Sequence, residues 1–249
     1  MEIDFYEEFP TKKNLEKLKL IKFPSRIFIA AYSAKEFEKY SKQARRINRK
    51  IRAAYWPIIK NSYWISPFSN TCDLIGLFDE LSKSKVHLLI NLEPPLLSKK
   101  LFFKNMFRFK KNKNLIKKFL EENKARVTTA QPPPILNIGI RKALGLDYKL
   151  NLEKGLMWYS SAYPEIINRK IRKNLLKIKN KERYTLGLGV IAQGVFSENL
   201  LSPEKLGADI NFIKEAGFRK VTIFRLGGLN KEYMDKINSF SLLVKKQEK

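Results

Sequence analysis

Carboxylate side chains end two β-prone runs of this sequence, and proline follows each of them closely. Glu93 stands directly before Pro94, and Glu7 and Glu8 stand just before Pro10. Two carboxylates in different environments, one protonated and one ionised, can act as the general acid and as the general base or nucleophile of a hydrolysis. We therefore predict Glu93 as an acid and Glu8 or Glu7 as its partner.

Side-chain alternation indicates which way these carboxylates point. In the run Val86–Glu93, Asn91 and Glu93 share one face, and the opposite face is purely aliphatic. The aliphatic face should pack on helices, so Asn91 and Glu93 should point away from them. In the first run, alternation favours Glu8, although a bend near the strand end could bring Glu7 inward instead. The alternative for Glu93 is a salt bridge with a neighbouring lysine.

Aromatic side chains with polar edges follow the third run. Trp56, Tyr63 and Trp64 lie in a stretch that helix packing does not require. Their rings could stack on the apolar faces of sugar rings or of bases, while their polar edges form hydrogen bonds. Ordinary packing within the loop is the alternative.

Further polar side chains end the remaining runs. They are Gln131 before three prolines, Tyr159, Gln193 and Arg225. Together with Asn91 and the aromatic loop, we predict that they bind the ligand.

The elements that would position these residues repeat along the whole chain. Eight β-prone runs alternate with helix-length stretches, which predicts a single α/β domain over residues 1–249, folded as a (β/α)8 TIM barrel. The runs are Ile3–Glu8, Arg26–Tyr32, Ile51–Pro57, Val86–Glu93, Arg126–Gln131, Leu156–Ser161, Tyr184–Gln193 and Val221–Leu226. Such a barrel gathers the C-terminal ends of its strands at one mouth, where the candidate residues should meet.

Two helix starts can be read from capping residues. Thr11 should cap a helix over Lys12–Ile21, because its hydroxyl can accept a hydrogen bond from an unpaired amide of the first turn. Ser202 followed by Pro203 should begin another helix, which Gly217 should end.

The segment Asn91-Leu92-Glu93-Pro94 resembles the Asn-Glu-Pro signature of retaining glycoside hydrolases with (β/α)8 barrels, whose acid/base glutamate ends the fourth strand. The chain departs from that signature because Leu92 separates asparagine from glutamate, and because Gln193 replaces the nucleophilic glutamate of the seventh strand. Glu198 lies five residues further on. The resemblance implies a pocket for a carbohydrate or another polyhydroxylated ligand, with paired glutamates as acid and base.

The chain is strongly basic, with a net charge of +26. Most of the excess falls on predicted helices, including Lys35–Arg52, Lys99–Lys118 and Arg169–Arg183. This charge would attract nucleic acid, anionic lipid surfaces or phosphorylated ligands, and it is equally typical of a solvated lysine-rich surface. The phenylalanine-containing half Lys99–Lys111 is also where we expect a lid over the mouth, if one exists.

These charges support two alternative functions. Arg225 and Gly227-Gly228 would suit a barrel that binds phosphate or processes phosphate esters. The segment Lys99–Lys118 would suit a non-catalytic module that docks on an anionic membrane or on nucleic acid.

Composition narrows the kinds of site and of protein that this sequence can represent. Cys72 is the only cysteine and His87 the only histidine, which argues against an internal disulfide and against a zinc site made of these residues. We predict no metal and no cofactor, and a glycine-rich dinucleotide fingerprint is absent. No apolar run approaches the ~20 residues that span a bilayer, and a basic-then-apolar leader is missing from the N-terminus. We therefore expect a soluble, cytoplasmic protein.

Overall fold

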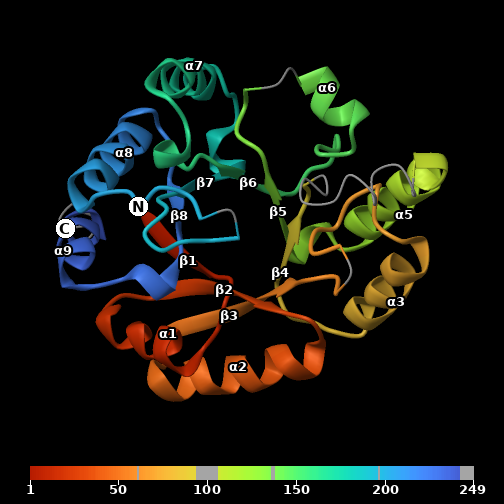
Figure 1. The fold of residues 1–249 in the computed structure, drawn as a ribbon, viewed down its shortest axis with the longest axis horizontal. Helices are drawn as coiled ribbons and strands as arrows, with labels where there is room; N and C mark the ends of the chain where they lie inside the picture. Colours follow the sequence, from red (N-terminus) through yellow and green to blue (C-terminus); the bar gives the residue numbers. More distant parts are fainter. Residues whose placement is uncertain (61, 94–105, 136–137, 196, 242–249) are drawn as a thin grey trace.

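The computed structural model describes residues 1–60, 62–93, 106–135, 138–195 and 197–241, and these form a closed parallel barrel (Figure 1). The strands follow one another in chain order and β8 pairs with β1. They are β1 Glu2–Glu7, β2 Ser25–Ala31, β3 Ile51–Pro57, β4 Leu88–Asn91, β5 Val127–Gln131, β6 Glu153–Met157, β7 Tyr184–Leu188 and β8 Lys220–Phe224. The predicted (β/α)8 TIM barrel is confirmed.

Helices surround the strands and cover the outer face of the barrel (Figure 1). The α-helices are α1 Lys12–Glu16, α2 Ala34–Ile47, α3 Thr71–Ser82, α5 Phe109–Glu122, α6 Ile138–Ala143, α7 Glu165–Leu176, α8 Pro203–Glu215 and α9 Lys231–Ser241. Short 3-10 helices are η1 Lys17–Leu20, η2 Met106–Arg108, η3 Lys124–Arg126, η4 Ser160–Ala162, η5 Lys181–Arg183 and η6 Leu226–Gly228.

Strand alternation divides the core into two apolar clusters. One lies between the strands and the helices and includes Phe5, Leu88 and Ile90. The other fills the barrel and includes Tyr6 and Leu89. Neighbouring residues of β1 and of β4 thus face opposite sides, as alternation predicts.

The bottom of the barrel is closed by charged side chains. The Arg26 guanidinium lies 2.9 Å from both Asp4 Oδ2 and Glu153 Oε1, and its Nη1 lies 2.9 Å from His87 Nε2. Although burial acts in the opposite direction, the neighbouring guanidinium of Arg26 lowers the pKa of the Glu153 carboxyl. This network explains why β6 begins at Glu153, three residues before the predicted start at Leu156. The Glu153 carboxylate has its partner, Arg26, on another strand.

The seventh strand is shorter than predicted. It ends at Leu188 rather than Gln193, because Gly189 adopts a positive φ of 88° and turns the chain. Val190 consequently packs inside the barrel. The fourth strand is also shorter, and Glu93 follows its last residue, Asn91, by two positions.

Both predicted caps are present. The Thr11 side chain accepts a hydrogen bond from Asn14 N, and the Ser202 side chain accepts one from Lys205 N. The first helix loses its α-helical form after Glu16 and continues as the 3-10 helix η1. Gly217 follows α8 with a φ of 86°.

Two predictions touch segments outside this description. Pro94-Pro95 lies outside the described residues. So do residues 99–105, which form most of the predicted lid and the first part of the predicted docking segment. Within the described part of the chain, no helix is both long and apolar enough to cross a membrane.

Candidate functional site

A cavity of about 520 Å³ opens at the C-terminal ends of the strands. It is lined by Glu8, Trp56, Tyr63, Trp64, Asn91, Glu93, Pro132, Pro133, Leu144, Leu146, Met157, Tyr159, Ala162, Tyr163, Val195, Glu198 and Phe224. The cavity is therefore where a barrel of this kind carries its chemistry.

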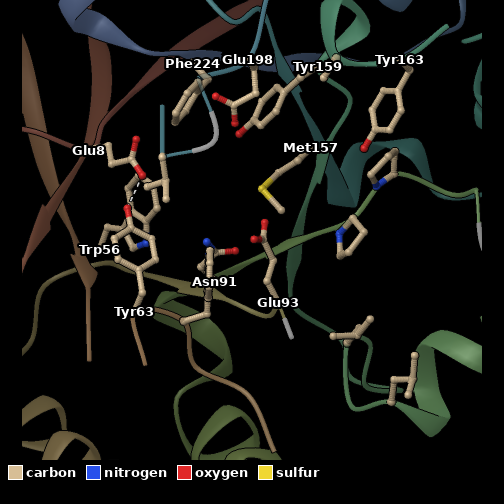
Figure 2. A pocket seen from close by; sticks show the side chains of 17 residues that line it. Glu8, Trp56, Tyr63, Asn91, Glu93, Met157, Tyr159, Tyr163, Glu198 and Phe224 are labelled. Carbon is tan, nitrogen blue, oxygen red and sulfur yellow. Dashed lines mark hydrogen bonds between the residues drawn. The ribbon is translucent and has the colours of Figure 1, made fainter. Parts of the chain in front are cut away.

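Three glutamates direct their carboxylates into this cavity from different sides (Figure 2). Glu8 directly follows β1, Glu93 follows β4, and Glu198 comes from the connection between β7 and α8. Glu8 and Glu93 reach the mouth because their side chains continue the inward alternation of Tyr6 and Leu89. Glu198 reaches it because the chain turns back after Gly189.

Glu93 is the most perturbed of these acids. Burial is the main cause that raises its pKa, to about 8, and the nearby carboxylates of Glu8 and Glu198 contribute. Among the described residues, no hydrogen bond or ion pair to Glu93 is found. The carboxyl is therefore protonated at neutral pH and can donate a proton to a ligand.

Glu8 is partly stabilised as an anion. Burial raises its pKa to about 7, while the hydrogen bond from the Tyr63 hydroxyl and the charge of Arg225 oppose this rise. Figure 2 shows the contact between Tyr63 and Glu8. The other oxygen, Oε2, is buried without a hydrogen-bond partner in the described structure. Glu8 thus keeps a free acceptor, which a base or nucleophile requires.

Polar atoms beside the glutamates also lack partners. Asn91 is 4% exposed, and its Oδ1 is buried with no partner among the described residues. Burial is the main reason that the pKa of the Tyr159 hydroxyl lies well above its usual value, so it stays protonated. An unsatisfied buried acceptor costs stability, which favours a ligand group as the missing donor.

Aromatic and sulfur-containing side chains make the walls of the cavity apolar. Trp56 contacts Tyr6, with ring centroids 5.8 Å apart, and Tyr159 contacts Phe224 at 5.1 Å. Met157 lies between the glutamates in Figure 2. These walls restrict water and raise the cost of ionising the carboxylates.

Glu7 and Arg225 lie outside the cavity. Glu7 is fully buried, and its Oε1 accepts hydrogen bonds from Phe9 N at 2.9 Å and from Asn14 Nδ2 at 3.1 Å. Arg225 Nη1 lies 3.4 Å from the same oxygen. Burial raises the pKa of Glu7, and Arg225 opposes that rise. The predicted alternative to Glu8 is thus a member of a structural ion pair.

The two predicted glutamines also lie outside the cavity. Gln131 is 1% exposed, and its Nε2 lies 3.1 Å from Thr129 Oγ1 and 3.5 Å from Asp147 Oδ1. Gln193 is exposed beyond the turn at Gly189, and its backbone carbonyl accepts a hydrogen bond of 3.0 Å from Arg225 Nε.

Several lining residues were missed by the sequence interpretation. Met157, Tyr163 and Phe224 all enter the cavity from segments at or just after strand ends. Their positions near strand ends could have indicated these residues. The sequence interpretation applied that criterion only to polar residues and to the aromatic loop. Among the described residues, no cluster of three or more His, Cys, Asp or Glu side chains could hold a metal ion.

Comparison with known proteins gives a match only at the level of structure. No family model matches the sequence, and no curated protein sequence matches it significantly. A chitinase from Chromobacterium violaceum superposes with a TM-score of 0.57 at 9% identity, over 95% of this chain and 98% of that one. The Bacillus cereus spore cortex-lytic enzyme SleL gives 0.57 at 10% identity, over 95% and 73%.

A variant of the class V chitinase from Nicotiana tobaccum, in complex with NAG4, gives a TM-score of 0.55 at 10% identity, over 94% of this chain and 98% of that one. At these identities the likeness shows the fold. The chain shares the (β/α)8 barrel of these proteins.

Proposed function

We propose that this protein hydrolyses glycosidic bonds of a carbohydrate bound in the cavity at the barrel mouth. The observation that carries the proposal is the group of three glutamates in an apolar-walled cavity, where Glu93 has a pKa of about 8 and Glu8 of about 7. Near neutral pH this arrangement keeps one carboxyl protonated while another is ionised, as glycosidic hydrolysis needs.

Each group has a distinct role in the reaction. Glu93 donates its proton to the glycosidic oxygen as the bond to the anomeric carbon breaks. Glu8 either removes a proton from the attacking water or attacks the anomeric carbon itself, and in the second case water, deprotonated by the ionised Glu93, then hydrolyses the glycosyl ester and frees Glu8. Asn91 and Tyr159 hydrogen-bond the sugar, and Trp56 and Trp64 supply aromatic surface against it.

The neighbouring folds support this choice of substrate class. Two chitinases and a spore cortex-lytic enzyme share the barrel, and one chitinase was solved in complex with NAG4. Oligomers of N-acetylglucosamine are therefore the first substrates to offer, followed by cello-oligosaccharides as a set without acetamido groups.

The test is release of new reducing ends from these oligosaccharides by the wild-type protein and by Glu93→Gln. We expect turnover of at least one oligosaccharide, and a fall in kcat of about 10²–10⁴-fold in the variant, because it cannot supply the proton. Leu176→Ala is a suitable control, since Leu176 is exposed at the last residue of α7 and lines no part of the cavity. The proposal fails if every oligosaccharide remains intact, or if Glu93→Gln retains wild-type turnover.

The phosphate-binding alternative receives less support from the geometry. The Arg225 guanidinium contacts Glu7 and the Gln193 carbonyl, and it lies over the Phe9 ring at 4.6 Å. Gly228 is needed for close packing, because a Cβ there would lie 1.7 Å from the Ile191 carbonyl oxygen. Arg225 and Gly228 thus both make contacts within the protein.

A further inference from the structure

A second cavity adjoins the first on the other side of Glu8 and Tyr63, which line both. Its volume is about 240 Å³, and it is formed by the chain after β1, the end of β2, the first turns of α2, and Ile58 after β3. It therefore belongs to the same mouth of the barrel, but none of the proposed catalytic steps uses it.

Exposed aromatic rings border this second cavity. Tyr32 is 58% exposed and Phe9 is 41% exposed, and both line the cavity. One face of the Phe9 ring is covered by the Arg225 guanidinium, 4.6 Å from the ring centroid. Exposed aromatic surface beside polar groups is typical of sites that bind sugar rings.

Glu36 holds the backbone of Tyr32 in place at the edge of the second cavity. The Glu36 carboxylate accepts a hydrogen bond from Tyr32 N at 2.8 Å and another from the Tyr40 hydroxyl at 2.9 Å. Within the described structure, the Tyr32 hydroxyl itself has no hydrogen-bond partner. The backbone of Tyr32 is thus fixed while its side chain stays available.

Tyr63, which stands between the cavities, has a strained backbone. Its φ is 64°, and hydrogen bonds in both directions join its main chain to that of Ile59, at 2.7 and 3.2 Å. Strain of this kind persists where surrounding contacts enforce it and is concentrated at functional sites. Here the Tyr63 hydroxyl donates a hydrogen bond to Glu8, and this pair lines both cavities.

We propose that the second cavity binds the adjoining sugar unit of an oligosaccharide, whose chain crosses the Glu8–Tyr63 pair and stacks on Tyr32. This inference rests on the proposed function, and it goes further by assigning oligosaccharides rather than single-sugar glycosides as substrates. It also sets the direction in which the chain leaves the first cavity, toward the β1 and β2 side of the mouth.

The test is the dependence of binding on chain length, measured by calorimetry. N-acetylglucosamine oligomers of one to four units, and cello-oligosaccharides of the same lengths, are titrated into full-length Glu93→Gln, whose turnover should be slowed about 10²–10⁴-fold. We expect affinity for one series to rise at least about tenfold from one unit to four. Adding Tyr32→Ala should remove about that factor for the four-unit oligomer and leave the monosaccharide unchanged.

Two further variants exclude a general effect of truncation. Tyr32→Phe keeps the ring and should retain most of the gain with length, and Leu176→Ala should behave as its parent. If oligomers bind but affinity is independent of length, or Tyr32→Ala has no effect, the second binding site is wrong and the proposed function survives. If neither series binds at any length, the proposed function falls as well.

Discussion

The glutamates of the cavity influence one another through their charges. Burial raises the pKa of Glu93 to about 8 and that of Glu8 to about 7, and in both cases Glu198 adds to the rise. Between these values Glu93 keeps its proton while Glu8 is ionised. The rate should therefore fall below pH ~7 as Glu8 becomes protonated, and above pH ~8 as Glu93 loses its proton.

The substitution Glu198→Gln removes the negative charge of Glu198 and keeps the size of its side chain. Removing a nearby negative charge makes ionisation of Glu93 easier, so the pKa of Glu93 should fall. We expect the alkaline limb of the kcat/KM profile to move to lower pH by several tenths of a unit, and the acid limb to move in the same direction, because Glu198 also raises the pKa of Glu8. A pH–rate profile of the wild type and the variant checks this, and an unmoved alkaline limb would show that Glu198 does not act on Glu93.

At the residue scale, local pattern predicted some site residues and failed for others. Asn91 and Glu93 were predictable because β4 is regular up to Asn91, and alternation then fixes which side chains point inward. In β5 the neighbour of Gln131, Ala130, lies inside the barrel, so alternation turns Gln131 away from it. The position of Glu198 was not predictable, because it depends on the path of an irregular connection.

The β7–α8 connection, which carries Glu198, is fastened to the end of β8. Arg225 Nε donates to the Gln193 carbonyl at 3.0 Å, and Ile191 N donates to the Phe224 carbonyl at 2.9 Å. The next residue after Gln193 is Gly194, whose amide lies 3.2 Å from Glu198 Oε2. Arg225 thus binds the backbone next to Gly194, whose amide contacts the Glu198 carboxylate.

Arg225→Ala should loosen this connection and leave Glu7 buried without its cation. We expect a loss of roughly 2–5 kcal/mol in the free energy of unfolding. Because Arg225 holds the pKa of Glu7 down, that pKa should rise further in the variant, and the loss should be larger at pH 9 than at pH 6. Urea denaturation at the two pH values measures both effects.

A second substitution distinguishes this explanation from simple loss of packing. Glu7→Gln added to Arg225→Ala should recover part of the stability at pH 9, since the uncompensated charge is gone. No recovery would mean that the ion pair contributes little and that the contact with Phe9 matters more.

Elements with local signals were predictable, and those that depend on distant partners were not. Thr11 and Ser202 cap helices through hydrogen bonds to amides three residues away, so the sequence contains the whole interaction. The start of β6 depends instead on Arg26, 127 positions earlier in the chain than Glu153. No window of sequence around Glu153 shows that pairing.

At the scale of the molecule, a basic exterior surrounds an acidic cavity. The chain has a net charge of +26, yet three glutamates line the cavity. Surface charges more than about 8 Å away are largely screened at physiological ionic strength. Burial therefore determines the protonation of Glu93, and the lysine-rich helices leave its pKa high.

The fold was far easier to predict than the reaction. Eight alternating runs suffice for a barrel, because parallel strands require crossovers and hydrophobic periodicity marks both elements. The same alternation of elements does not determine the reaction. Barrels with one topology catalyse many different reactions, because only particular side chains at the mouth differ.

The most direct test of the central claim compares two leaving groups in Glu93→Gln. A general acid matters when the departing oxygen needs a proton, and hardly at all when it departs as a stable anion. The measurement is kcat/KM, which reports the bond-breaking step whether Glu8 acts as base or nucleophile, for an N-acetylglucosamine tetramer and for the 2,4-dinitrophenyl glycoside of an N-acetylglucosamine oligomer. We predict a fall of about 10²–10⁴-fold on the tetramer and less than about tenfold on the dinitrophenyl glycoside. Equal effects on both substrates, or no effect on either, would contradict the role assigned to Glu93.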